Sequence, residues 1–107
     1  MIEVVYHKQY HRVTVEGHAY SAEPGHDLVC AAASALAYTL AANVANLADC
    51  GHVRIDSIEL ASGKAEISCK PVTRHKSTVG LVYQAVCVGF EVLAHDYPQY
   101  IRYKILG

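Results

Sequence analysis

The sequence predicts an α+β fold, a two-layer sandwich in which helices cover a mainly antiparallel sheet. Three observations lead to this fold class. Short stretches near both ends and in the middle alternate apolar and polar residues, as strands do. Two longer apolar stretches carry helical spacing instead. These stretches follow one another in the order β-β-α-β-β-α-β, so hairpins are joined by helices.

The first strand pair is expected at 2–6 and 12–16, on either side of the polar Lys8-Gln9 break. Alternation on both sides of this break is typical of an antiparallel hairpin with one face in water. A second pair is expected at 53–60 and 65–70, joined through Ser62-Gly63-Lys64. In that pair Ile67 and Cys69 have the inward parity.

The first helix is expected over 28–48, a stretch without a charged residue and rich in alanine, the best helix former. Large apolar residues recur there at helical spacing, namely Leu36, Leu40, Val44 and Leu47. The stretch is long enough to span a bilayer, but polar residues interrupt it and alanine contributes little to membrane insertion. It is therefore interpreted as a buried helix of a soluble protein, whose outer side meets the second helix or a second subunit.

The second helix is expected over 78–97, where apolar residues step by three or four until Pro98 stops the pattern. Residues 100–105 alternate again and close the chain as a strand. With 107 residues, 52% of them hydrophobic and 18% charged, the chain matches one globular domain over 1–107. Little core is to spare at this size, so dimerisation is a natural supplement.

The charge and the cysteines limit the classes of partner and compartment. A formal net charge of −1 gives no overall attraction to nucleic acid or to an anionic membrane, so neither is expected as a partner. The N-terminus starts directly with a strand-like pattern and shows no signal peptide. The four cysteines are spread along the chain without the close pairing of a secreted disulfide framework. A reducing cytoplasm is the expected location.

The stretch from Gly17 to Ser34 carries the chemistry. Asp27 is a suitable N-cap for the first helix, which places Cys30 in its first turn. Unpaired amides and the positive end of the helix dipole lower the pKa of a thiol there, so Cys30 is expected to be a reactive nucleophile. The first-turn amides, those of Cys30 and Ala31 included, are candidate donors to a tetrahedral oxyanion.

A thiolate nucleophile needs a general base, and imidazole has a suitable pKa. His18 and His26 both precede Cys30 in the chain, and spacing does not choose between them. The alternative is that Cys30 is a small buried hydrophobe in an alanine-rich helix.

Metal binding is the first competing interpretation of a chain with seven histidines and four cysteines. No Cys-x-x-Cys pair occurs, and no metal and no cofactor are expected. Cys50-Gly51-His52 is interpreted as a helix C-cap that turns into a strand. Cys69 and Cys87 have inward-facing parity and are expected in the core.

The segments Gly17-His18-Ala19 and Gly25-His26-Asp27-Leu28-Val29-Cys30-Ala31, with Ser34 following, resemble the signature of the ribosomal-processing cysteine protease family, Prp. The resemblance extends to the chain length, the uncharged helix, the second hairpin and the tyrosine-rich final strand. It implies a homodimeric endopeptidase that removes the N-terminal extension of the twenty-seventh large-subunit ribosomal protein. That precursor peptide is the expected partner.

The same resemblance assigns roles residue by residue. Cys30 is the implied nucleophile, His18 the base, and Asp27 the supporting acidic residue, while His26 falls at a variable position. The loop 20–25 is implied to cover the peptide groove, with Tyr20, Gly25 and Ser34 as substrate-binding candidates. Because the family's extension carries consecutive aromatic residues before the cut, the groove is expected to be apolar, with Tyr20, Tyr38 and Tyr83 as candidate walls. The competing function is a non-enzymatic, dimeric, ribosome-associated binding module on the same fold.

Overall fold

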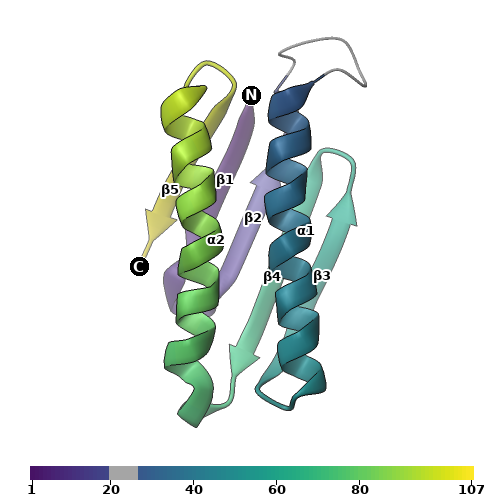
Figure 1. The fold of residues 1–107 in the computed structure, drawn as a ribbon, viewed down its shortest axis with the longest axis vertical. Helices are drawn as coiled ribbons and strands as arrows, with labels where there is room; N and C mark the ends of the chain where they lie inside the picture. The colour runs from purple at the N-terminus through teal and green to yellow at the C-terminus, as the bar shows by residue number, and fades with distance from the viewer. Residues whose placement is uncertain (20–26) are drawn as a thin grey trace.

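The computed structural model describes residues 1–19 and 27–107 as two helices packed on one face of a five-stranded sheet (Figure 1). The order of helices and strands is β-β-α-β-β-α-β, as predicted, with two short 3₁₀ turns between them. The elements are β1 (Ile2–His7), η1 (Lys8–Tyr10), β2 (Arg12–Glu16), α1 (Leu28–Asp49), β3 (Val53–Ala61), β4 (Lys64–Pro71), η2 (Thr73–His75), α2 (Lys76–Asp96) and β5 (Ile101–Leu106).

The strands lie in the order β3-β4-β2-β1-β5. Three of the four neighbouring pairs are antiparallel, and only β1 and β5 run parallel, so the prediction of a mainly antiparallel sheet is confirmed. The parallel pair joins the two ends of the described chain, with Ile2 opposite Ile101. A β-bulge between Ile55 and Ser57 shifts the register of β3 against β4.

The core lies between the sheet and the two helices. One face of each strand contributes to it, for instance Ile2, Val4 and Tyr6 of β1, because side chains alternate across a strand. From α1 the buried side chains are spaced by three or four residues, as an inward helical stripe requires, and α2 repeats this spacing. These stripes are Val29, Ala33, Ala37, Leu40, Ala41 and Val44 on α1, and Val79, Tyr83, Val86, Cys87 and Phe90 on α2.

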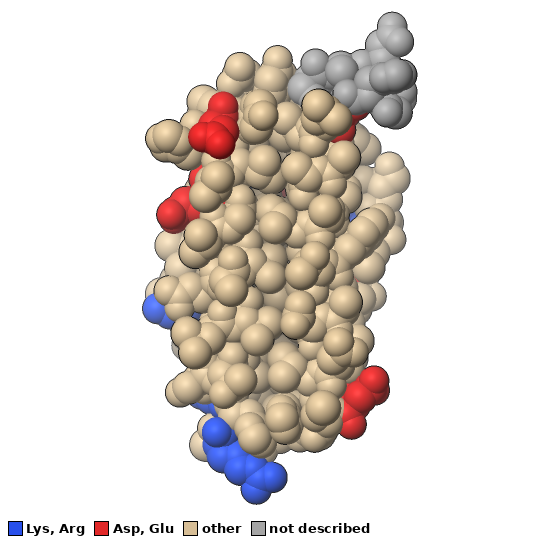
Figure 2. Space-filling view, viewed as in Figure 1, with Lys and Arg blue, Asp and Glu red and all other residues tan. Residues whose placement is uncertain are grey.

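The outer side of the helical layer is exposed and almost free of charge. Only Asp49 is charged in α1, and the charged residues of α2 stand near its two ends. In Figure 2 the acidic and basic side chains accordingly lie around the rim of this face, while its centre holds neither. Exposed apolar side chains on it include Tyr38, Leu81, Val88 and Val92.

Two helical segments, Leu28–Asp49 and Thr73–Asp96, are long and apolar enough to cross a membrane by length and composition alone. Only 33% and 28% of these apolar windows are buried in the fold. Each helix nonetheless places one stripe on the sheet, and core helices of soluble proteins pass the same test. The expected second contact of α1 is found in α2, while the rest of its outer side is uncovered.

Candidate active site

Cys30 lies in the first turn of α1, and Asp27 caps this helix. The Cys30 N–H donates to Oδ1 of Asp27 at 3.0 Å, and the Asp27 backbone is extended, as an N-cap residue requires. The thiol itself is partly buried. The predicted cap is therefore present, and it places the sulfur where the helix dipole favours a thiolate.

The amides that were expected to bind an oxyanion are already used. The Cys30 N–H is bonded to the Asp27 side chain, and the Ala31 N–H donates to the Asp27 carbonyl oxygen at 3.1 Å. The prediction that these two amides form an oxyanion hole is wrong for this conformation, because capping and the first helical bond satisfy both donors.

Ala19 supplies a main-chain donor that the sequence did not reveal. Its N–H points at Sγ of Cys30 with 3.3 Å between nitrogen and sulfur, and Ala19 is itself buried. A hydrogen bond donated to sulfur favours the thiolate over the thiol. Every residue except proline carries such an N–H, so only the path of the chain could identify this one.

His18 is the second residue after β2 and is half-buried. Its carbonyl oxygen accepts a hydrogen bond from the amino group of Met1 at 2.6 Å. Its imidazole lies against Gly63, in the turn between β3 and β4. The position of His18 thus depends on two segments distant in sequence.

His18 and Cys30 line one cleft of about 330 Å³, which lies between α1 and the β3–β4 hairpin. Ser34 and Tyr38 reach it from α1, and Leu60 reaches it from β3. Tyr38 and Leu60 are both exposed large side chains, so this cleft offers apolar surface beside the thiol. In Figure 1 the start of α1 and the tip of the β3–β4 hairpin lie toward the same end of the molecule.

The structure therefore brings together Cys30, His18, Ser34 and Tyr38 among the predicted residues, with Asp27 capping the adjoining turn. Tyr20, Gly25 and His26 lie outside the described residues. Tyr83 as a wall of the groove is wrong: its side chain is fully buried in the core, where its hydroxyl donates to the Ile67 carbonyl oxygen at 3.3 Å. Leu60 and Gly63 line the cleft without having been predicted to do so.

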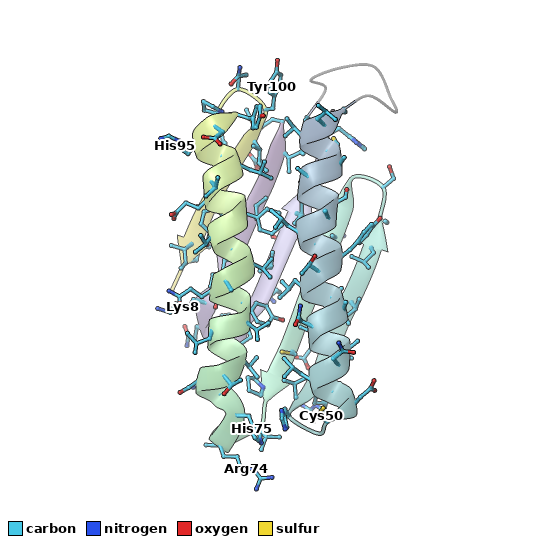
Figure 3. All side chains as sticks on the ribbon, viewed as in Figure 1. Lys8, Cys50, Arg74, His75, His95 and Tyr100 are labelled. Carbon is cyan, nitrogen blue, oxygen red and sulfur yellow. The ribbon has the colours of Figure 1, made fainter. Side chains whose placement is uncertain are left out.

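The remaining cysteines differ from Cys30 in their surroundings. Cys69 and Cys87 are buried in the core, as predicted, and burial raises the pKa of both thiols, that of Cys87 to about 11. Cys50 is exposed at the opposite end of α1, on the side where His75 lies (Figure 3). All four cysteines are in the described segments, and none of them forms a disulfide.

Metal ligands do not gather anywhere in the described part of the chain: no group of three or more His, Cys, Asp or Glu residues there is arranged to hold an ion. The cleft instead combines a thiol at a helix start, a histidine and an apolar wall. A thiol beside a histidine is the arrangement that thiol-dependent hydrolases use.

Comparison with known families identifies the kind of enzyme. The family model described as cysteine protease Prp matches residues 1–102, so the chain belongs to the cysteine protease Prp family. It is thus an enzyme of the cysteine-protease class. No curated protein matches the sequence.

Solved structures share the fold over nearly the whole chain. The essential ribosomal processing protease Prp from S. aureus, in complex with a covalently linked product peptide, has a TM-score of 0.75 and 24% identity, covering 98% of this chain and 97% of that one. The same S. aureus protease with a substrate peptide has a TM-score of 0.69 at the same identity and coverage. SMU.848 from Streptococcus mutans has a TM-score of 0.68 and 28% identity, covering 98% and 91%.

Proposed function

We propose that this protein is a cysteine endopeptidase that removes the N-terminal extension of the twenty-seventh large-subunit ribosomal protein, with Cys30 and His18 as its catalytic dyad. The observation that carries the proposal is the shared cleft, in which both side chains meet an apolar wall. Membership of the cysteine protease Prp family and the S. aureus relative, a ribosomal processing protease with a bound peptide, support this substrate class.

In the proposed reaction, the Cys30 thiolate attacks the scissile carbonyl carbon and forms a tetrahedral oxyanion. The Ala19 N–H lies 3.3 Å from the sulfur, and an oxyanion bonded next to that sulfur is within reach of this donor. His18 holds the thiol proton and gives it to the departing amine, which leaves a thioester on Cys30. His18 then takes a proton from water, and the resulting hydroxide hydrolyses the thioester.

The peptide groove is proposed to run along α1 and β3. Tyr38 and Leu60 offer apolar surface for the aromatic residues that the family resemblance places before the cut. Ser34 lies one helical turn after Cys30 in the same cleft, where its hydroxyl is a polar contact for the peptide backbone.

The direct test incubates the extended ribosomal precursor with the protein and with its Cys30→Ala variant, and reads the new N-terminus by mass spectrometry. The wild-type chain should trim the precursor at one position, and the variant should not. A precursor left intact by both would contradict the proposed substrate. Trimming by Cys30→Ala would remove Cys30 as nucleophile.

A second test isolates the dyad from the substrate. On a Cys50→Ser background, iodoacetamide should modify Cys30 alone at neutral pH, because the pKa values of the buried Cys69 and Cys87 thiols are raised. His18→Ala should slow this alkylation. The pH at which the alkylation rate is half-maximal should move toward the pKa of an ordinary thiol, about 8.5. An unchanged profile would remove His18 as the partner of Cys30.

We also propose that the enzyme is a single-domain cytoplasmic homodimer. One continuous core supports a single domain over 1–107, and four cysteines without a disulfide fit a reducing compartment. The uncharged outer face of α1 and α2 supports a second copy as its cover, since a soluble helix normally presents charged residues to water.

A further inference from the structure

The turn between β3 and β4 reaches the candidate active site because of how the sheet is paired. β2 pairs with β4 in a register that places Glu16 opposite Lys64. Gly17 follows β2 and Gly63 precedes β4, and these two residues continue the pairing: the Gly17 N–H donates to the Gly63 carbonyl oxygen at 2.9 Å. His18, one residue further, therefore lies beside the turn.

The imidazole of His18 occupies the space into which a side chain at Gly63 would point. A methyl group added to Gly63 would lie 2.6 Å from Nε2 of His18, 3.2 Å from Cε1 and 3.4 Å from Cδ2. Carbon atoms in contact are normally about 3.5–4.0 Å apart, so a side chain and this ring position exclude each other. Gly63 also has a φ of +75°, which L-residues rarely adopt.

We propose that Gly63 is a positioning residue for the catalytic base. The missing side chain allows the imidazole to rest on the turn, and this contact sets how far the ring stands from Cys30 in the cleft that all three line. The inference rests on the proposed role of His18.

A side chain at Gly63 would displace the ring rather than the sheet. The turn is fixed on one side by the pairing of Ala61 with Lys64 and on the other by the hydrogen bond from Gly17. The imidazole stands at the end of a side chain with two rotatable bonds, so it is the part that yields. The fold then survives while the base moves away from its working position.

The chain offers a matched control for the backbone effect. Gly51 has a φ of +76°, nearly that of Gly63, but a methyl group added there meets nothing within 4 Å. Gly63→Ala and Gly51→Ala therefore carry the same conformational penalty, and only the first touches His18. Comparable thermal unfolding midpoints of the two variants would establish that both are folded and equally strained.

The main measurement is the pH profile of Cys30 alkylation by iodoacetamide on the Cys50→Ser background. This reagent is small, so a narrowed peptide cleft does not hinder it. Gly63→Ala should move the profile toward that of His18→Ala, whereas Gly51→Ala should keep the wild-type profile. With a peptide substrate, Gly63→Ala should lower kcat by about 100-fold, as a misplacement of about 1 Å can do. A methyl group that merely narrowed the cleft would raise KM and leave the profile unchanged.

Gly63→Asn separates strain from contact. Asparagine tolerates a positive φ better than alanine, yet it carries the same Cβ. Gly63→Asn should be more stable than Gly63→Ala, and the pH profile of Cys30 alkylation should shift from the wild-type profile by the same amount in both variants. A wild-type profile in both Gly63 variants, or an equal displacement in Gly51→Ala, would overturn the inference.

The outcomes also separate this inference from the proposed function. If the wild-type chain leaves the ribosomal precursor intact but the Gly63 variants still shift the alkylation profile, the substrate is wrong and the positioning role stands. If His18→Ala leaves the profile unchanged, the base assignment fails, and the role of Gly63 is overturned with it.

Discussion

Asp27 contacts Cys30 through the backbone at the start of α1. Its side chain accepts the backbone N–H of Cys30 and thereby fixes the residue that carries the sulfur. Its negative charge, however, opposes a thiolate nearby, because like charges raise each other's pKa. The contact with the Cys30 N–H makes Asp27 the N-cap of α1.

Two substitutions test this assignment. Asp27→Ala should lower the free energy of unfolding by about 1 kcal/mol, the usual effect of losing an N-cap. Asp27→Asn keeps a capping oxygen and should recover most of that loss. If capping is the whole role, Asp27→Asn also retains peptide cleavage, measured beside its stability in chemical denaturation. An inactive but fully stable Asp27→Asn protein would show that the carboxylate itself is required.

His11 is a second histidine whose surroundings determine its charge. It lies buried between η1 and β2 in the chain, has a φ of 47°, and meets the ring of Tyr83 edge-on. Burial, and then the nearby Lys76 ammonium, lower the pKa of His11 below its ordinary value. The native state therefore holds His11 neutral at a pH where the unfolded chain already binds a proton.

This difference predicts acid sensitivity. As pH falls below about 6.5, the unfolded state gains the proton first, so the free energy of unfolding decreases until the native pKa is reached. His11→Asn, which suits the left-handed backbone, should reduce this slope in denaturation series between neutral and mildly acidic pH. Part of it should remain, since desolvation and the neighbouring His52 also lower the pKa of His75. A slope unaffected by His11→Asn would contradict the assignment.

At the scale of elements, the two helices are in close contact where Gly89 faces Leu36. A methyl group on Gly89 would come within 2.7 Å of Cδ2 of Leu36, whereas one on Gly80, in the same helix, would meet nothing within 4 Å. Gly89 therefore serves the packing of α1 on α2. Gly80 serves no such contact and leaves α2 with a residue of low helix propensity.

The pair predicts opposite results for one chemical change. Gly80→Ala should raise the free energy of unfolding by about 0.5–1 kcal/mol, because alanine loses less backbone entropy in a helix. Gly89→Ala gains the same propensity but must move Leu36, so it should show no gain or a net loss. Urea denaturation of both variants measures the difference, and equal stabilisation would show that the Leu36 contact is not tight in solution.

Periodicity could predict the strands and the two α-helices, because burial of one face sets the spacing of apolar residues along the chain. The uncharged alanine-rich stretch became α1, and alternation at 100–105 became β5. Strand order left no such local pattern, since the pairing of β4 with β2 depends on the whole core. Gly63 could not be assigned to His18 for that reason. The prediction of Tyr83 as a groove wall was wrong because helical spacing shows which residues share a helix face. It does not show whether that face lines a cleft or the core.

The dyad candidates came from a short motif. This motif predicts the nucleophile and its helix cap but not the main-chain donor to the sulfur. A cap followed by a cysteine is local, so Asp27 and Cys30 were placed correctly. The donor to the sulfur is Ala19, whose contribution is a backbone N–H and leaves no mark in the sequence. The expected Cys30 and Ala31 donors failed because the same cap that was predicted uses them.

At the scale of the whole molecule, charge separates the two faces. The open face of the sheet carries ion-forming residues such as Glu3 and Arg102, which approach to 3.8 Å. The outer face of the helices instead presents Leu81, Val88 and Val92 in one stripe of α2. A homodimer joined through the helices would cover this stripe.

A negative charge introduced into the apolar stripe of α2 tests that dimer. Val88→Glu should shift the protein from dimer to monomer in sedimentation velocity, because a buried unpaired carboxylate is strongly unfavourable in an interface. Lys104→Glu, on the open face of the sheet, should leave the association state unchanged. Dissociation by Lys104→Glu but not by Val88→Glu would place the interface on the sheet.

The parallel pairing of β1 with β5 has a consequence for how the protein reaches this structure. The first strand cannot complete its hydrogen bonds until the last one arrives, so the sheet closes the largest loop that the described chain allows. Contacts of such long range slow the search for the native state. During synthesis, one edge of β1 would stay unpaired until β5 has left the ribosome. Ile2 of β1 lines the cleft, so this part of the cleft wall would gain its last neighbouring strand at the end of synthesis.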